Sequence, residues 1–268
     1  MNSKLSVYVL AFNEEAKLED CIKSVLWADE VVLIDSLSTD KTPQIAEELG
    51  VKVVQVDFEG FGKIRLAGIE HTTHDWILSI DADERCTPDA QNEILGILGS
   101  SASADAYFIP RRNIFMGKKI KFCGWYPDYR QPQLFKRGKL TYEAEHQVHE
   151  GYSVMGKVGH LKNPIIQIPF LSYSELIQKM DRYTKLGAEK LLSKNTQVSS
   201  FNIAFRSCWA FIQTYIIKLG FLDGWAGFVI AFCNMEGTFF KYIKYKELLR
   251  QNSNALNDWA NQADCSGG

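Results

Sequence analysis

Four short apolar runs alternate with helix-like segments along the first 90 residues, and this alternation is the strongest constraint on the fold. The runs cover residues 5–11, 30–35, 51–56 and 76–80, and the segments between them carry helical spacing or helix-capping residues. Parallel strands need long crossover connections, which are usually helices. The sequence therefore predicts an α/β protein with a mostly parallel sheet and flanking helices.

The fourth run leads directly into two carboxylates, Asp81 and Asp83, which are separated by one small residue. Open α/β sheets bind their ligands at the carboxyl ends of the strands. Two hard oxygen ligands in that place suit Mg²⁺ or Mn²⁺ bound together with a phosphorylated substrate. The alternative is a strand followed by a helix start, with Thr87 as N-cap and Pro88 in the first turn. We expect that helix start too, but it does not explain the two aspartates.

The common glycine-rich motifs for phosphate binding are missing from the sequence. The turn after the first run has no glycine at residues 11–14, and Gly62-Lys63 is not followed by Ser or Thr as the P-loop requires. We therefore expect a metal at the two aspartates, rather than a helix N-terminus, to carry most of the phosphate charge.

Bulk properties narrow the class of protein. The formal net charge of −2 indicates no nucleic-acid partner. Six cysteines form no C-x-x-C pair, which favours a reducing, cytoplasmic location. The first residues read as a strand rather than a signal peptide, and no uncharged apolar run reaches 18 residues.

Three motifs resemble glycosyltransferase family 2, both in order and in spacing. They are VYVLAFNEE at 7–15, VVLIDSLSTDKT at 31–42 and ILSIDADE at 77–84. The resemblance extends from residue 5 to about residue 150. It implies an inverting sugar transferase with a GT-A fold, a Rossmann-like and mostly parallel sheet with flanking helices.

The resemblance implies roles for residues after the first two runs. Asp35 matches an aspartate that approaches the nucleotide base, and Ser36 stands where many relatives have a second acid. Asn13 and Glu14 fall where the first loop lines the nucleotide pocket. For Asn13, a role as helix cap is the alternative.

The same resemblance implies roles for two basic residues and for the aspartate pair. Lys63 and Arg65 match a basic stretch that faces the donor, with a solvated helix face as the alternative. Asp81 and Asp83 match the D-x-D pair of the family, and Asp83 is the expected direct metal ligand. The metal would offset the charge of the leaving nucleoside diphosphate.

The catalytic base is sought among the acids of residues 143–150. An inverting transferase needs a carboxylate that takes the proton from the acceptor hydroxyl. Residues 148–150 resemble lipopolysaccharide-core β-1,4-glucosyltransferase-like proteins, which implies Glu150 as base and His149 as a metal or diphosphate contact. Glu145 is the alternative base. His149 can also be a buried structural histidine, and zinc is not expected because too few further ligands lie nearby in sequence.

Arginines and aromatic residues gather at 110–113 and 124–130. Aromatic faces suit sugars and arginines suit phosphates. The alternative is a packed second sheet with arginines on its surface.

Residues 171–268 are expected to form a helical, partly amphipathic appendage to a catalytic domain at 1–170. Thirteen of the 33 aromatic residues lie between 201 and 245. Two apolar runs, 207–217 and 224–235, are too short to span a bilayer but suit helices at the interface, and the break between them predicts a helical hairpin. The flanking basic residues, which anionic headgroups would favour, are Arg206, Lys218, Lys241, Lys244 and Lys246. The alternative is packing on the catalytic domain or on a second subunit in a homodimer.

Together these features predict an inverting, Mg²⁺- or Mn²⁺-dependent glycosyltransferase. By resemblance, it moves a hexose from a UDP-linked nucleotide-sugar to a lipopolysaccharide-core or other lipid-linked acceptor, at the inner face of the cytoplasmic membrane. One alternative is a non-catalytic sugar-nucleotide or glycan-binding relative in envelope polysaccharide assembly. Another is a nucleotidyltransferase, but the glycine-rich basic loop expected after the first strand is missing.

Overall fold

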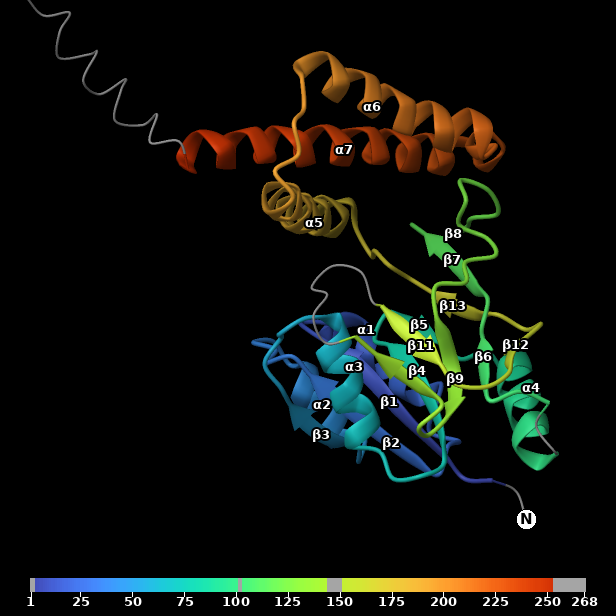
Figure 1. The fold of residues 1–268 in the computed structure, drawn as a ribbon. Helices are drawn as coiled ribbons and strands as arrows, with labels where there is room; N and C mark the ends of the chain where they lie inside the picture. Colours follow the sequence, from blue (N-terminus) through green and yellow to red (C-terminus); the bar gives the residue numbers. More distant parts are fainter. Residues whose placement is uncertain (1–2, 101–102, 144–150, 253–268) are drawn as a thin grey trace, which may run out of the picture. The chain divides into compact units, whose positions relative to one another are not determined.

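The computed structural model describes residues 3–100, 103–143 and 151–252. The chain divides into two compact units (Figure 1). The first, here the sheet unit, comprises residues up to 119 together with 125–169. The second, here the helical unit, comprises residues 120–124 and those from 170 onward.

The sheet unit is built on a seven-stranded sheet, counted within the described residues, with the order β12-β6-β9-β4-β1-β2-β3. β1 pairs in parallel with β2 and β4, and β2 pairs in parallel with β3. β9 is antiparallel to both β4 and β6, and β12 is parallel to β6. The strands are β1 (Leu5–Ala11), β2 (Glu30–Asp35), β3 (Lys52–Gln55), β4 (Trp76–Asp81), β6 (Ala106–Phe108), β9 (Pro132–Lys136) and β12 (Val158–His160). The predicted α/β fold of GT-A type, with a mostly parallel sheet and a C-terminal helical region, is confirmed.

Both faces of this sheet are covered by apolar side chains, as its continuous apolar strands require. Along β1, Val7 and Val9 join one buried cluster, whereas Tyr8 and Leu10 join the other. Each fully buried large apolar side chain contributes about 1.5–3 kcal/mol. Helices α1 (Glu15–Lys23), α2 (Thr42–Glu48) and α4 (Pro88–Gly99) supply the first cluster, and α3 (Phe61–Glu70) supplies the second.

The helix starts follow local sequence signals, with one correction. The Thr87 side chain accepts a hydrogen bond from the backbone N–H of Ala90, and Pro88 begins α4, as predicted. Asn13 does not cap α1, because the helix begins after Glu14. The backbone of Asn13 instead adopts a left-handed φ of 53°, a conformation that asparagine tolerates better than most residues.

Two smaller sheets complete the sheet unit. One has the order β5-β13-β7-β8, and the other pairs β10 with β11. Their strands are β5 (Glu84–Arg85), β7 (Arg111–Phe115), β8 (Lys118–Lys119), β10 (Leu140–Tyr142), β11 (Tyr152–Val154) and β13 (Ile165–Gln167). The antiparallel pairing of β13 with β5 sets Gln167 opposite Glu84, next to the aspartate pair.

The helical unit contains α5 (Tyr173–Ser193), α6 (Ser200–Ile212) and α7 (Gly224–Asn252), and both α5 and α6 pack on α7 (Figure 1). A π-helical turn, η1 (Gln213–Ile217), and a 3-10 turn, η2 (Gly220–Asp223), connect α6 to α7, so the predicted hairpin is confirmed. Close packing at the hairpin requires glycine, since a Cβ on Gly227 would lie 1.8 Å from the carbonyl oxygen of Gly220.

No single described helix is both long and apolar enough to cross a membrane. The pair 200–217 and 220–251, bent by 69°, meets that test by length and composition only.

Candidate functional site

Asp35 and Asn13 are linked through one serine at the carboxyl ends of β1 and β2. Asp35 is fully buried, and its carboxylate accepts hydrogen bonds from the backbone N–H (2.9 Å) and the hydroxyl of Ser38. The Ser38 hydroxyl in turn accepts from the backbone N–H of Asn13 (2.8 Å), and Asn13 Oδ1 accepts from the N–H of Thr39 (2.8 Å). The structure thus brings these two predicted donor-binding residues into one loop network.

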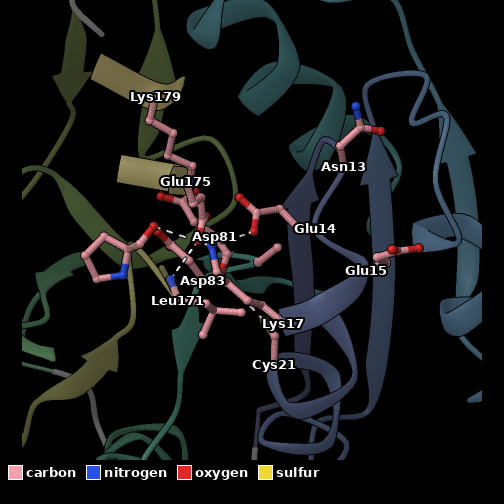
Figure 2. Close-up of polar contacts among 12 residues, drawn as sticks. Asn13, Glu14, Glu15, Lys17, Cys21, Asp81, Asp83, Leu171, Glu175 and Lys179 are labelled. Carbon is pink, nitrogen blue, oxygen red and sulfur yellow. Dashed lines mark hydrogen bonds and ion pairs between the residues drawn. The ribbon is translucent and has the colours of Figure 1, made fainter. Parts of the chain in front are cut away.

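Glu14 faces a different partner from its neighbour Asn13. Its carboxylate forms an ion pair of 2.9 Å with Lys17, whose side chain is buried, and Figure 2 shows Glu14 directed toward Lys17. Lys17 Nζ also donates to the carbonyl oxygen of Pro169 at 3.4 Å. Lys17 therefore connects Glu14 to the end of the sheet unit, while the backbone N–H of Glu14 donates to Thr42 Oγ1 at 2.9 Å.

Of the two predicted basic residues on α3, only Arg65 reaches the aspartates. Arg65 is buried, and its guanidinium donates to Ser79 Oγ (2.8 Å) and Asp81 Oδ1 (3.2 Å). Lys63 instead forms an exposed ion pair with Glu59. Residues two apart on a helix do not share a face, which explains the difference.

Asp81 is charged at neutral pH. Burial alone would raise the pKa of its carboxyl, but the positive charges of Arg65 and Arg111 outweigh burial and hold the pKa below its usual range. The side chain keeps part of its surface exposed, at 30%. An ionised, partly accessible carboxylate is what a divalent cation needs.

Asp83 is held by β13, the strand that pairs with β5 in the four-stranded sheet. Both of its carboxylate oxygens lie near the side-chain amide nitrogen of Gln167, at 3.3 and 3.4 Å, and its carbonyl oxygen accepts from the N–H of Ile168 at 2.8 Å. Asp83 is half-buried and lies close to Asp81 in Figure 2. The pairing of β13 with β5 thus orients the second aspartate.

The sequence did not predict the buried ion pair between Glu84 and Arg111, which supports the backbone of Asp81. Glu84 and Arg111 are both fully buried and form an ion pair through Glu84 Oε1. Glu84 Oε2 also accepts from the backbone N–H of Asp81 (3.0 Å) and from Gln133 Nε2 (2.9 Å). Burial alone would lower the pKa of Arg111, but Glu84 and Asp81 outweigh it and raise the pKa, so the guanidinium stays charged. The sequence indicated two alternative roles for the arginines of residues 110–113, phosphate binding or a place on the surface of a second sheet. Arg111 has neither role, because it is buried and paired with Glu84.

A divalent metal fits this arrangement. No group of three or more His, Cys, Asp or Glu side chains able to hold a metal occurs among the described residues. Mg²⁺ commonly needs only one or two protein carboxylates, with waters and substrate phosphates as the other ligands, and Asp81 and Asp83 meet that need. Glu145, His149 and Glu150, the predicted base candidates and metal contact, lie outside the described residues.

The sequence also resembles known proteins. Similar curated proteins include an uncharacterised glycosyltransferase of Rickettsia bellii, 28% identical over 94% of this chain and 89% of the relative. Another is the lipopolysaccharide core biosynthesis glycosyltransferase LpsC of Rhizobium meliloti, 26% identical over 85% of this chain and 89% of the relative.

Similar solved structures include S. aureus TarS 1–349 in complex with UDP-GlcNAc, at 16% identity, 93% and 92% coverage of the two chains, and a TM-score of 0.49. Glucosyl-3-phosphoglycerate synthase from Mycobacterium tuberculosis in complex with Mn²⁺ and UDP-glucose is 26% identical over 42% of this chain and 44% of that chain, with a TM-score of 0.36. The family model for glycosyl transferase family 2 matches residues 6–155, which is more than half of the 268 residues. The chain therefore belongs to glycosyl transferase family 2.

Proposed function

We propose that the protein is an inverting, divalent-metal-dependent glycosyltransferase. It moves a hexose from a UDP-linked nucleotide-sugar to a lipopolysaccharide-core or other lipid-linked acceptor. The observation that carries the proposal is the placement of Asp35 and the Asp81–Asp83 pair along one edge of the parallel sheet. Asp35 is in register with Ala11, and Asp81 is in register with Leu10, on either side of β1. Two strand spacings, about 10 Å, separate them, a distance that one extended nucleotide spans.

Each residue at this edge has a role in the proposal. Asp35 lies on the side that the nucleotide base approaches, and the loop network around Asn13 holds it in place. Asp83, supported by Asp81, holds Mg²⁺ or Mn²⁺. When bound, the metal offsets the negative charge that develops on the leaving nucleoside diphosphate.

Proton transfer is assigned to the segment outside the described residues. Glu150 takes the proton from the acceptor hydroxyl as that oxygen attacks the sugar carbon, and Glu145 is the alternative base. His149 contacts the metal or the diphosphate. In this proposal residues 1–170 form the catalytic domain, and residues 171–268 form the helical region that contacts the membrane in which the acceptor is anchored.

The lipid-linked acceptor is supported by one relative and by the surface of the helical unit. The relative LpsC is named for lipopolysaccharide core biosynthesis, which supports an acceptor of that class. The β-1,4-glucosyltransferase-like subgroup remains part of the proposal. Phe201 and Trp225 are 78% and 71% exposed. A stripe of exposed apolar residues, spaced by three or four, comprises Phe201, Phe205, Trp209, Ile212 and Ile216. Such a stripe suits the surface of the cytoplasmic membrane, and a homodimer contact is the alternative.

The test is a donor screen on the full chain. UDP-, GDP-, ADP- and CMP-sugars are added with Mn²⁺, with Mg²⁺ or with EDTA, and both thermal stabilisation and slow donor hydrolysis are measured. We expect stabilisation by UDP-sugars that requires metal and disappears in Asp83→Asn. Asp20→Asn, the same change at an exposed position on α1, is the control and keeps the response. Stabilisation that persists in Asp83→Asn refutes the metal assignment, and donor binding without any turnover favours the non-catalytic alternative.

A further inference from the structure

A cavity of about 310 Å³ lies between α5 and α7, entirely within the helical unit. α5 contributes Lys179, Met180 and Tyr183, and α7 contributes Asn234, Gly237 and Lys241. The cavity is open to solvent, since Tyr183 on its wall is 57% exposed. This cavity is about ten times the ~30 Å³ that one water molecule occupies in the liquid. It therefore falls at the lower end of the range for small-ligand sites, which begins near 300 Å³.

The polar part of the lining is positively charged. It contains Lys179 and Lys241 and no carboxylate. Lys179 Nζ lies 3.3 Å from Glu175 Oε1, whereas among the described residues no carboxylate forms an ion pair with Lys241. Lys241 Nζ is held 4.9 Å from the centroid of the Tyr242 ring. An ammonium group that is half-buried and lacks a carboxylate partner favours an anionic ligand group, such as phosphate.

The uncharged part of the lining mixes apolar side chains with the polar side chains of Thr184, Asn234 and Thr238, and it includes one glycine, Gly237. Met180 and Tyr183 line this side, and Met180 can adapt to the shape of a ligand. Gly237 lies in the interior of the 29-residue helix α7, where glycine costs about 0.5–1 kcal/mol relative to alanine. A Cβ at this position would meet Met180 Cγ at 3.7 Å and Thr184 Cγ2 at 3.9 Å, which are ordinary contacts. Alanine would therefore fit without a clash but would occupy part of the volume next to Met180.

We propose that this cavity binds the phosphate and the first methylene groups of a single-chain lipid phosphate, the anchor of the lipid-linked acceptor. The ammonium group of Lys241 would hold the phosphate, and the wall formed by Met180 and Tyr183 would hold the chain. The assignment to the acceptor rests on the proposed function. A bilayer phospholipid has the same kind of headgroup, so the experiment must separate these two sources.

The test is calorimetric titration of the full chain with decyl phosphate, below its critical micelle concentration. We expect one saturable site, with a dissociation constant raised at least tenfold in Lys241→Gln and in Gly237→Leu. Lys185→Gln, the same change at an exposed position on α5 outside the cavity lining, is the control and binds within twofold of the unmodified chain. If Gly237→Leu does not fold, Gly237→Ala replaces it and is expected to weaken binding while leaving the melting temperature unchanged or higher.

Further titrations decide the ligand class. Inorganic phosphate and dihexanoyl phosphatidylglycerol should each bind at least tenfold more weakly than decyl phosphate. Equal affinity for inorganic phosphate refutes the lipid site, and equal or tighter binding of phosphatidylglycerol refutes the acceptor assignment. Unchanged decyl phosphate binding in both cavity variants, or no saturable binding, refutes the site. A UDP-sugar titration of the same samples reports on the sheet unit, so that failure of the donor proposal is recognised separately.

Discussion

The buried ion pair between Glu84 and Arg111 leads to the sharpest prediction about the sheet unit. Glu84→Gln keeps the size and shape of the side chain but removes its charge. In the structure both carboxylate oxygens accept hydrogen bonds, one from Arg111 and the other from the Asp81 N–H and Gln133. A glutamine has one acceptor oxygen, so its NH₂ group must face a donor in either orientation. The Arg111 guanidinium then stays buried without its ion-pair partner.

The expected cost follows from that geometry. Removing one partner of a buried ion pair destabilises a protein by about 3–5 kcal/mol. In a chain of 150–250 residues, 1 kcal/mol shifts the melting temperature by about 2–4 °C. Glu84→Gln should therefore lower the melting temperature by roughly 6–20 °C. The stabilisation by donor and metal should fall as well, because Glu84 holds the backbone N–H of Asp81.

Thermal unfolding followed by circular dichroism measures the first effect, and the donor screen measures the second. Glu59→Gln is the matched control, since it makes the same change in an exposed ion pair with Lys63. Exposed ion pairs contribute little to the free energy of unfolding, so the control should have nearly the same melting temperature as the unmodified chain. A Glu84→Gln variant that melts within 2 °C of the control would refute the reasoning, because the buried pair would then contribute no more than a surface pair.

Three further predictions test other parts of the chain. Asp40 accepts hydrogen bonds from the backbone N–H groups of Thr42 and Glu15, which outweigh burial and lower its pKa. Its stabilisation is therefore complete above the unfolded pKa of about 3.9 and is lost as the pH falls through the lower folded pKa. The difference in melting temperature between the unmodified chain and Asp40→Asn should shrink between pH 5 and pH 2, and a constant difference contradicts this. Glu150→Gln should retain donor binding in the thermal shift assay but lose transfer; if Glu145→Gln does so instead, Glu145 is the base. The double variant Phe201→Ser/Trp225→Ser should bind vesicles of phosphatidylcholine and phosphatidylglycerol at least tenfold more weakly, with Phe58→Ser in the sheet unit as control. Unchanged vesicle binding, with a change in oligomeric state instead, would favour the dimer contact.

The parts of the fold that local sequence determines were predicted most accurately. Strands β1 and β2 match their predicted ranges residue for residue, because a strand buried on both faces is a continuous apolar run bounded by polar residues. The third run, 51–56, was predicted less well, since only 52–55 pairs with β2. The start of α6 was missed as well. Ser199 caps the helix, so α6 begins at Ser200, seven residues before the predicted apolar run 207–217, and the end of that run forms the π-helical turn.

The parts of the site that depend on distant pairings could not be predicted. Arg111 lies 27 residues from Glu84 in sequence, and no local pattern distinguishes a buried arginine from an exposed one. Gln167 lies 84 residues from Asp83 and reaches it only through the pairing of β13 with β5. The separation of Lys63 from Arg65, by contrast, could have been predicted, because helical geometry already places them on different faces.

These distant contacts explain how two aspartates on a turn are kept in place. Arg65 of α3 holds the side chain of Asp81, and Glu84 holds its backbone N–H. Gln167 of β13 holds the side chain of Asp83. Because each support comes from a different element, a change in one of them leaves the other carboxylate oriented, and the site should lose affinity in steps rather than all at once. Arg111, which is fully buried, forms no described hydrogen bond with either aspartate; it forms an ion pair with Glu84, and its positive charge also lowers the pKa of Asp81. The buried Glu84–Arg111 pair therefore helps to position the backbone N–H of Asp81 and the side chain of Gln133, at the cost of burying two charges.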